Sequence, residues 1–343
     1  MRREGGGAKA HEWVGFRTME QCCQIPEILC NHSRCAAFQS MTTSEPTMFK
    51  TLTLLFTFLG VLPACAQIGG SLRERIAQRM QSAAEPRGEE MSYGSDPLQK
   101  LDYWKPTAPG SPIVIYVHGG GWKRGDKRMA SGEKGTHFVQ QGYAFASLNY
   151  RLVPSCTVEE QAQDVANGIA YLIRNAEKLG FDGKRVALIG HSAGAHLVAL
   201  VGTDLSYLKI AEVGPKALRG VIPLDGAAYD VSRQIAEGGD FMHDTYLQAF
   251  GTDPERQKKL SPTVQAAAPN APAFLILHVQ RVDGTAQSIS LGEALRKAGT
   301  PAEVKGFEGR GLQGHAEINR KLGDPSYPAT PVVDAWLKTI LAK

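Results

Sequence analysis

Short apolar segments alternate with helix-like segments along residues 112–341, and this alternation constrains the fold more than any other feature of the chain. The apolar segments lie at 112–117, 143–148, 185–190, 220–224, 273–279 and 302–307. Apolar residues spaced three or four apart indicate helices at 158–179, through 200 after the third segment, at 285–298 and at 331–341. This order predicts an α/β fold, with a mostly parallel sheet covered by helices on both faces. We expect one domain over 67–343, in which the more polar and irregular segment 231–260 forms a small cap.

The segment "RVALIGHSAGAHL" (185–197) joins an apolar strand to a helix through small residues. Gly190 and Gly194 flank Ser192 in the pattern G-x-S-x-G, in which the serine occupies a strained turn that exposes its hydroxyl. Small residues at this junction would also let a strand and a helix pack closely without any chemistry. The strand before the motif and the helix after it favour Ser192 as a nucleophile.

A second glycine-rich segment, "YVHGGGWKRGDK" (116–127), follows the strand at 112–117. Consecutive glycines let backbone N–H groups approach a reacting oxygen that side chains would otherwise block. We expect the N–H groups of Gly119, Gly120 and Ala193 to form an oxyanion hole. The alternative, a flexible glycine turn, explains the triplet alone but not the presence of both motifs in this order.

A serine hydroxyl needs a base, and in folds with this serine turn the chain order is serine, acid, histidine. His315 is the last histidine and lies in a glycine-rich loop after the strand at 302–307. The other histidines past the N-terminal segment precede Ser192, lie on its own helix, or come before the last strand: His118, His137, His191, His196, His243 and His278. His315 is therefore the predicted base.

The predicted acid is Asp283, which lies in a polar loop just beyond the strand at 273–279. A carboxylate there would hold His315 in one tautomer and stabilise its imidazolium form. Asp283 is also in a position to cap the following helix, which is the structural alternative. Asp225 and Asp230, which follow the strand at 220–224, are the second choices.

Together these motifs resemble α/β-hydrolases, most closely bacterial esterases with an HGGGW loop, such as carboxylesterases and feruloyl or acetyl esterases acting on plant polysaccharides. The resemblance extends from about Tyr93 onwards and includes lead-in strands at 93–106 and "SLNYRL" at 147–152. It implies that Trp122, Asn149 and Tyr150 support the oxyanion loop and pocket. The acid segment, "HVQRVDGTAQS" (278–288), departs from the family because it lacks the usual flanking glycine and proline.

The expected activity is hydrolysis of carboxylic esters through an acyl-enzyme, on small or short-chain acyl, aryl or carbohydrate esters. An amide hydrolase with the same residues, such as an aryl-formamidase or exopeptidase, is the enzymatic alternative. A further and more distant alternative is a non-catalytic binding protein with this fold. The expected partner is an ester substrate, with no metal or organic cofactor. A net charge of +4 without a dense Lys/Arg stripe indicates no nucleic-acid partner.

Residues 48–66, "MFKTLTLLFTFLGVLPACA", have the layout of a signal peptide: one early lysine, an apolar centre and a small-x-small end. The apolar stretch is shorter than the ~20 residues that span a bilayer. We therefore expect cleavage after Ala66, export to the periplasm or outside the cell, and no integral membrane segment in the mature chain. Lipid attachment through Cys65 is the alternative.

Residues 1–47 precede this signal and show no sustained periodicity. We interpret them as an upstream extension that is not part of the native protein, which would start at Met48 or Met41. The alternative is a genuine extension with a metal or disulfide role for its cysteines, although their spacing matches no strong zinc pattern. These cysteines are Cys22, Cys23, Cys30 and Cys35.

Overall fold

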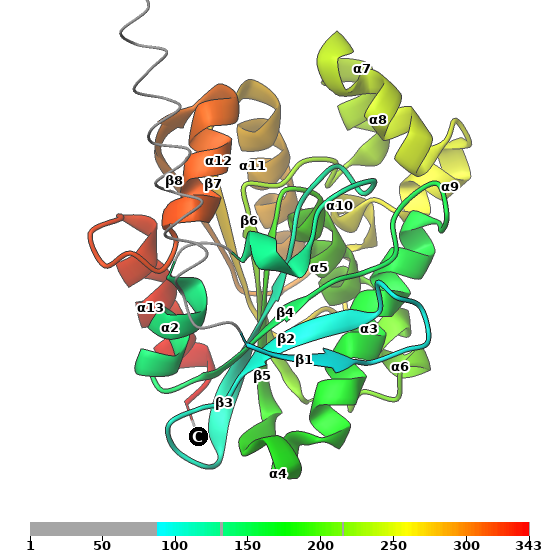
Figure 1. Cartoon of the computed structure of the whole chain (residues 1–343). Helices are drawn as coiled ribbons and strands as arrows, with labels where there is room; N and C mark the ends of the chain where they lie inside the picture. The colour runs from blue at the N-terminus through cyan, green and yellow to red at the C-terminus, as the bar shows by residue number, and fades with distance from the viewer. Residues whose placement is uncertain (1–87, 131–132, 215, 343) are drawn as a thin grey trace, which may run out of the picture. The chain divides into compact units, whose positions relative to one another are not determined.

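The computed structural model describes residues 88–343 except 131–132, 215 and 343. The predicted extension (1–47) and signal peptide (48–66) lie outside the described residues. In the described part, eight strands form one sheet in the order β1-β2-β4-β3-β5-β6-β7-β8 (Figure 1). Their bounds are β1 Glu89–Ser92, β2 Lys100–Trp104, β3 Ser111–Val117, β4 Ala144–Leu148, β5 Phe181–His191, β6 Leu218–Leu224, β7 Phe274–Gln280 and β8 Ala302–Arg310.

The sheet is mostly parallel, as predicted. Strand β2 pairs antiparallel with β1 and β4, and every other neighbouring pair is parallel. At the carboxyl ends of the strands, Gly190 of β5 lies opposite Val117 of β3, and Leu224 of β6 lies opposite Leu277 of β7. The segments that leave β3, β5, β6 and β7 therefore begin at one edge of the sheet.

Helices cover both faces of this sheet, and the alternation of side chains along each strand explains why. In β3, Ile113 and Ile115 belong to one buried cluster, whereas Val114 and Tyr116 belong to the other. Helices α3 (Val158–Arg174), α5 (Ala193–Thr203), α6 (Ser206–Ile210) and α11 (Val282–Lys297) contribute to the first cluster. Helices α2 (Lys134–Gln140), α12 (Gly311–Lys321) and α13 (Ala329–Ile340) contribute to the second.

Two segments differ from the sequence-based expectation. The helix predicted at 158–179 is interrupted at Asn175, and α4 (Ala176–Leu179) then ends at Gly180, as expected, with φ of 85°. Residues 231–260 are helical rather than irregular: they form α7 (Val231–Glu237), α8 (Asp240–Phe250) and α9 (Pro254–Lys259), followed by α10 (Pro262–Gln265). Figure 1 shows α7 and α8 at the same end of the molecule as α11 and α12, which follow β7 and β8.

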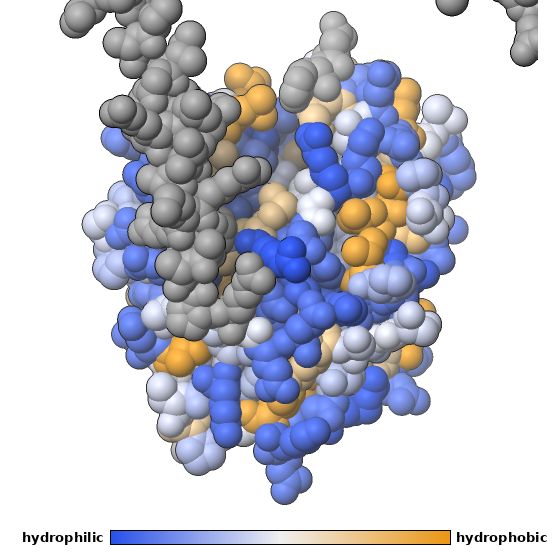
Figure 2. Space-filling model, viewed as in Figure 1, coloured by the Kyte–Doolittle hydropathy of each residue, from blue (hydrophilic) through white to orange (hydrophobic). Residues whose placement is uncertain are grey.

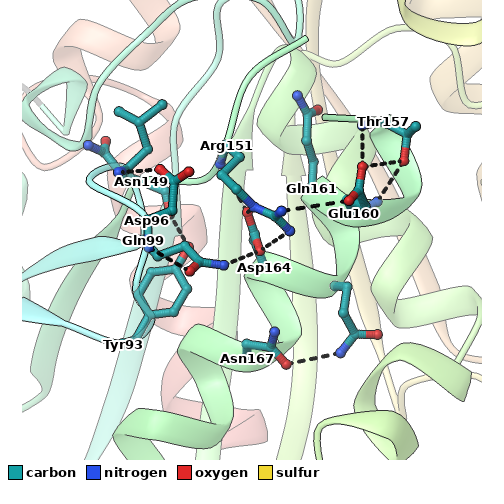
Figure 3. Close-up of polar contacts among 12 residues, drawn as sticks. Tyr93, Asp96, Gln99, Asn149, Arg151, Thr157, Glu160, Gln161, Asp164 and Asn167 are labelled. Atoms are coloured by element: carbon teal, nitrogen blue, oxygen red, sulfur yellow. Dashed lines mark hydrogen bonds and ion pairs between the residues drawn. The ribbon is translucent and has the colours of Figure 1, made fainter. Parts of the chain in front are cut away.

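A buried carboxylate fixes the segment that follows β4 (Figure 3). Asp164 of α3 is fully buried and accepts hydrogen bonds from the Nε and Nη2 atoms of Arg151 at 2.8 and 2.9 Å, and from Gln99 Nε2 at 2.8 Å. A two-pronged guanidinium–carboxylate pair restricts orientation as well as distance. It holds residues 149–151 beside the loop that follows β3, where Asn149 and Tyr150 contact that loop.

The surface of the described part carries only scattered large apolar side chains. Those most exposed are Ile210, Val264, Val282, Ile289 and Leu312. In the view of Figure 2, apolar areas are separated by hydrophilic side chains. No helix among the described residues combines the length and apolarity needed to cross a bilayer.

Candidate active site

Ser192 lies on a sharp turn between β5 and α5. Its backbone has φ of 56° and ψ of −119°, a conformation that non-glycine residues rarely adopt. A Cβ atom on Gly190 would lie 2.1 Å from the carbonyl oxygen of Gly194, and one on Gly194 would lie 2.2 Å from that of Val117. Close packing and presentation of the serine are thus one arrangement, since the turn forms only where α5 meets the ends of β3 and β5.

The glycine loop after β3 lies directly against this turn. A Cβ atom on Gly119 would lie 2.8 Å from Ser192 Cβ, so the loop backbone itself adjoins the serine. Gly120 has φ of 125°, and a Cβ there would lie 2.0 Å from the carbonyl oxygen of Arg124. Only glycine fits these two positions. The predicted donors lie on the two segments that meet at Ser192: Gly119 and Gly120 on this loop, and Ala193 at the start of α5.

The histidine that starts this loop orients its backbone. The His118 ring is buried, contacts the Gly119 carbonyl through Nδ1 at 2.7 Å and stacks on Tyr150 at 4.3 Å between centroids. The Tyr150 hydroxyl donates to the His118 carbonyl at 3.0 Å. Burial lowers the pKa of His118 to about 4, so the ring is neutral at pH 7 and Nδ1–H donates to Gly119.

Trp122 connects the loop to α5 and to α8. Its backbone is left-handed, with φ of 60°, and its indole Nε1 donates to His196 Nδ1 at 3.3 Å. His196 Nε2 in turn contacts the carbonyl of Leu260 at 2.8 Å, and the Trp122 ring meets Phe250 edge-on at 4.7 Å. The supporting roles that the resemblance implied for Trp122 and Tyr150 agree with these contacts, and Asn149 braces the loop through the backbone N–H of Lys127.

His315 lies on α12, not in the loop predicted from its glycine-rich sequence. Its Nδ1 lies 2.6 Å from Asp225 Oδ2. Its carbonyl oxygen lies 2.9 Å from His191 Nε2, and the two rings are 4.4 Å apart between centroids. Burial lowers the pKa of His191 well below its usual value, with a further contribution from His315, so neutral His191 donates this hydrogen bond. Because His191 precedes Ser192, the bond ties the first turns of α12 to the serine turn.

The prediction that Asp283 pairs with His315 is wrong. Asp283 lies in the first turn of α11, and its Oδ2 accepts a hydrogen bond from Gln234 Nε2 at 3.2 Å. Helix α11 begins two residues after β7 ends, which leaves no loop long enough to turn this carboxylate towards α12. Asp230, the other second choice, caps α7 by accepting from the backbone N–H of Arg233.

Asp225, the first of the second choices, is the carboxylate on His315. It follows β6 directly, is fully buried and has a left-handed backbone with φ of 47°. Its Oδ1 accepts from the backbone N–H of Val279 at 3.0 Å, and its Oδ2 also faces Arg281 Nε at 3.2 Å. Sequence reasoning did not single out Arg281 or His191. A lone arginine at the end of an apolar strand was the available signal for the first.

Among the described residues, no group of three or more His, Cys, Asp or Glu side chains is arranged to hold a metal ion. Cys156 is buried, and burial raises the pKa of its thiol to about 11. The segments that meet at this end of the sheet carry a hydroxyl, an imidazole paired with a carboxylate, and the backbone N–H groups of the glycine loop.

Comparisons with known proteins show which proteins this chain is similar to. Residues 101–217 match the BD-FAE family model. Esterase LipC of Mycobacterium tuberculosis is 32% identical over 218 residues, or 60% of this chain and 54% of LipC. Esterase LipQ of the same organism is 31% identical over 214 residues, or 58% of this chain and 50% of LipQ. The chain thus spans about half the length of these curated relatives.

The fold is also that of solved esterase structures. Esterase B from Lactobacillus rhamnosis superposes with a TM-score of 0.61 at 23% identity, over 80% of this chain and 93% of Esterase B. At that identity the likeness concerns the fold, which is the α/β-hydrolase fold.

The buried histidines give the folded protein a defined sensitivity to acid. Burial lowers the pKa of His118 and of His196 to about 4, against about 6.5 for an unfolded chain. Below pH 6.5 the unfolded chain therefore binds protons that the folded chain does not. Their stabilising contribution is complete above pH 6.5 and declines as the pH falls towards 4, by about 1.4 kcal/mol per pH unit for each histidine.

We predict that His196→Gln makes the free energy of unfolding less dependent on pH, by about 1.4 kcal/mol per pH unit, because glutamine cannot titrate. Urea unfolding at pH 7, 6 and 5 measures the free energy of unfolding. The exposed His243→Gln is the matched control and should keep the wild-type slope. An unchanged slope in His196→Gln would show that this ring is not held neutral in the folded state.

Proposed function

We propose that this chain hydrolyses carboxylic esters with Ser192 as nucleophile. The match of residues 101–217 to the BD-FAE family model and the likeness of the fold to that of solved esterases support the proposal. The observation that carries the proposal is the 2.6 Å contact between His315 Nδ1 and Asp225 Oδ2, with His315 tied to the serine turn through His191. A carboxylate on Nδ1 leaves Nε2 of the neutral ring as the basic atom, which a serine hydroxyl requires.

In the proposed reaction, Ser192 Oγ attacks the ester carbonyl carbon while His315 Nε2 takes its proton. The N–H groups of Gly119, Gly120 and Ala193 stabilise the developing oxyanion, and Asp225 stabilises the imidazolium. His315 then protonates the departing alcohol. A water molecule, deprotonated by the same ring, attacks the acyl-enzyme and releases the acid. This chemistry needs no cofactor.

For the substrate, we propose an ester with a small or short-chain acyl group. The support is the position of α8, which lies against the oxyanion loop: a Cβ atom on Gly121 would meet Thr245 Cγ2 at 3.0 Å and Met242 Cε at 3.8 Å. A helix this close to the loop restricts the room for a long acyl chain on that side. The resemblance to feruloyl and acetyl esterases supports a carbohydrate on the alcohol side, and an aryl acyl group such as feruloyl is the alternative to a short alkyl one.

We predict that Ser192→Ala lowers turnover of p-nitrophenyl acetate by at least ~10⁴-fold, because the nucleophile is lost. The exposed Ser206→Ala is the control and should retain wild-type turnover. A fluorophosphonate probe should label the wild type but not Ser192→Ala. Full turnover in Ser192→Ala would refute the assignment.

The same assay addresses the substrate class. We expect p-nitrophenyl acetate and butyrate to exceed the octanoate, with methyl ferulate and acetylated xylan as the aryl and carbohydrate tests. Faster cleavage of p-nitroacetanilide than of the acetate would replace the ester hydrolase with an amide hydrolase.

The two candidate acids form a matched pair for testing. We predict that Asp225→Asn lowers kcat by about 10³–10⁴-fold, because the amide no longer holds the reactive tautomer of His315. Asp283→Asn should stay within about threefold of the wild type, since its carboxylate accepts a hydrogen bond from Gln234 of α7 and does not contact His315. Thermal unfolding of both variants controls for folding. The reverse ranking would return the role of acid to Asp283.

We also propose export, which rests on the sequence of residues 48–66 alone. Expression from Met48 in a bacterial host should yield a processed protein that starts at Gln67, as read by N-terminal sequencing. A diacylated chain starting at Cys65 would support the lipid-anchored alternative, and an unprocessed chain in the cytoplasm would contradict both.

A further inference from the structure

Two basic side chains contact the same carboxylate oxygen of Asp225. His315 of α12 reaches Oδ2 at 2.6 Å, and Arg281, the residue after β7, reaches the same Oδ2 through Nε at 3.2 Å. The other carboxylate oxygen accepts only a neutral backbone N–H, that of Val279. A proton on His315 therefore shares its counter-ion with a permanent cation.

The guanidinium is held in place by its surroundings. Arg281 Nη2 donates to the carbonyl of Gly226 at 2.9 Å, and the side chain is 12% exposed. The guanidinium of Arg281 packs against Gly284 in the first turn of α11. A Cβ atom on Gly284 would lie 2.5 Å from Arg281 Nη2, so a side chain there would overlap the guanidinium. Close packing against Gly284 and the bond to Gly226 keep the charge beside Asp225.

The other titratable groups near this pair are three rings that are neutral near pH 7 and two charged side chains. The charged ones are Lys134 of α2, which also lowers the pKa of His191, and Glu317 of α12, which pairs with Lys321. His191, which contacts His315, has its pKa lowered well below the usual value by burial. The loop after β6 contributes Tyr229, whose pKa is raised by burial and by Asp225. Burial also raises the pKa of Tyr327, before α13, to about 12, with Glu317 and Asp225 adding to the effect. Among the described residues, Asp225 forms ion pairs with His315 and with Arg281. Arg281 is the permanent cation of the two.

We propose that Arg281 is a positioning residue that holds Asp225 and sets the lower pH limit of activity by opposing protonation of His315. The inference rests on the proposed function of His315 as base. A fixed cation makes the imidazolium less favourable, so His315 remains available as a base at lower pH. The same ion pair orients the carboxylate of Asp225.

The test compares the pH dependence of kcat/KM in Arg281→Gln with that in Arg281→Lys. Removing the charge stabilises the imidazolium, so the acid limb in Arg281→Gln should move to higher pH by about two units, as expected for unit charges ~6 Å apart at an effective dielectric constant near 20. Arg281→Lys keeps the charge, and its acid limb should stay near that of the wild type. A purely structural role would lower the rate at every pH and leave the limb in place.

Gly284→Ala supplies a second variant that retains the arginine. Gly284 has no positive φ, and alanine is favourable in a helix, so the fold should persist. The added methyl group displaces the flexible guanidinium from Asp225, and the acid limb should again move to higher pH, by about half a unit. An acid limb unchanged from the wild type in both Arg281→Gln and Gly284→Ala, or moved to lower pH, overturns the proposal.

A readout independent of turnover separates this inference from the proposed function. In the Ser192→Ala background, NMR titration of the His315 ring should show its midpoint at higher pH when Arg281→Gln is added. The result holds or fails whether or not the protein cleaves esters. An identical midpoint with and without Arg281 would overturn the role of the cation even in an active esterase.

Discussion

At Gly190 and Gly194 the backbone of α5 comes so close to the ends of β3 and β5 that a side chain at either position would overlap a carbonyl oxygen. At this contact Ser192 has a positive φ of 56°, which non-glycine residues rarely adopt. The same contact brings the glycine loop after β3 against the serine, because Val117, the last residue of β3, supplies one of the two oxygens. Nucleophile and oxyanion loop thus share one packing constraint.

The opposite side of the site depends on electrostatics rather than on close packing. Asp225 is a fully buried carboxylate, which is costly unless it is paired. Its three partners come from two segments: His315 from α12, and Val279 and Arg281 from the end of β7. Asp225 thus follows β6, whereas Val279 and Arg281, which contact its carboxylate, come from the end of β7. These contacts connect the carboxyl ends of the two neighbouring strands.

Histidines near the site illustrate how packing sets chemical role. Burial keeps His118, His191 and His196 neutral, and each makes a structural hydrogen bond: to the oxyanion loop, to the backbone of α12, and between Trp122 and Leu260. Among these rings in the described part, His315 is the one that faces a carboxylate. Residue type alone does not distinguish them.

The sequence alone indicated the alternation of strands and helices outside residues 231–260, the serine turn, the glycine loop and His315 as the candidate base, because each is a local pattern or follows from chain order. Tertiary structure decided the acid. The carboxyl ends of β6 and β7 are adjacent in the sheet, so an aspartate after either strand is a candidate. The start of α11 turns Asp283 towards α7 and leaves Arg281 to face Asp225. That outcome depends on where a helix begins and which oppositely charged groups meet in a buried space, and neither is encoded in a local pattern of residues.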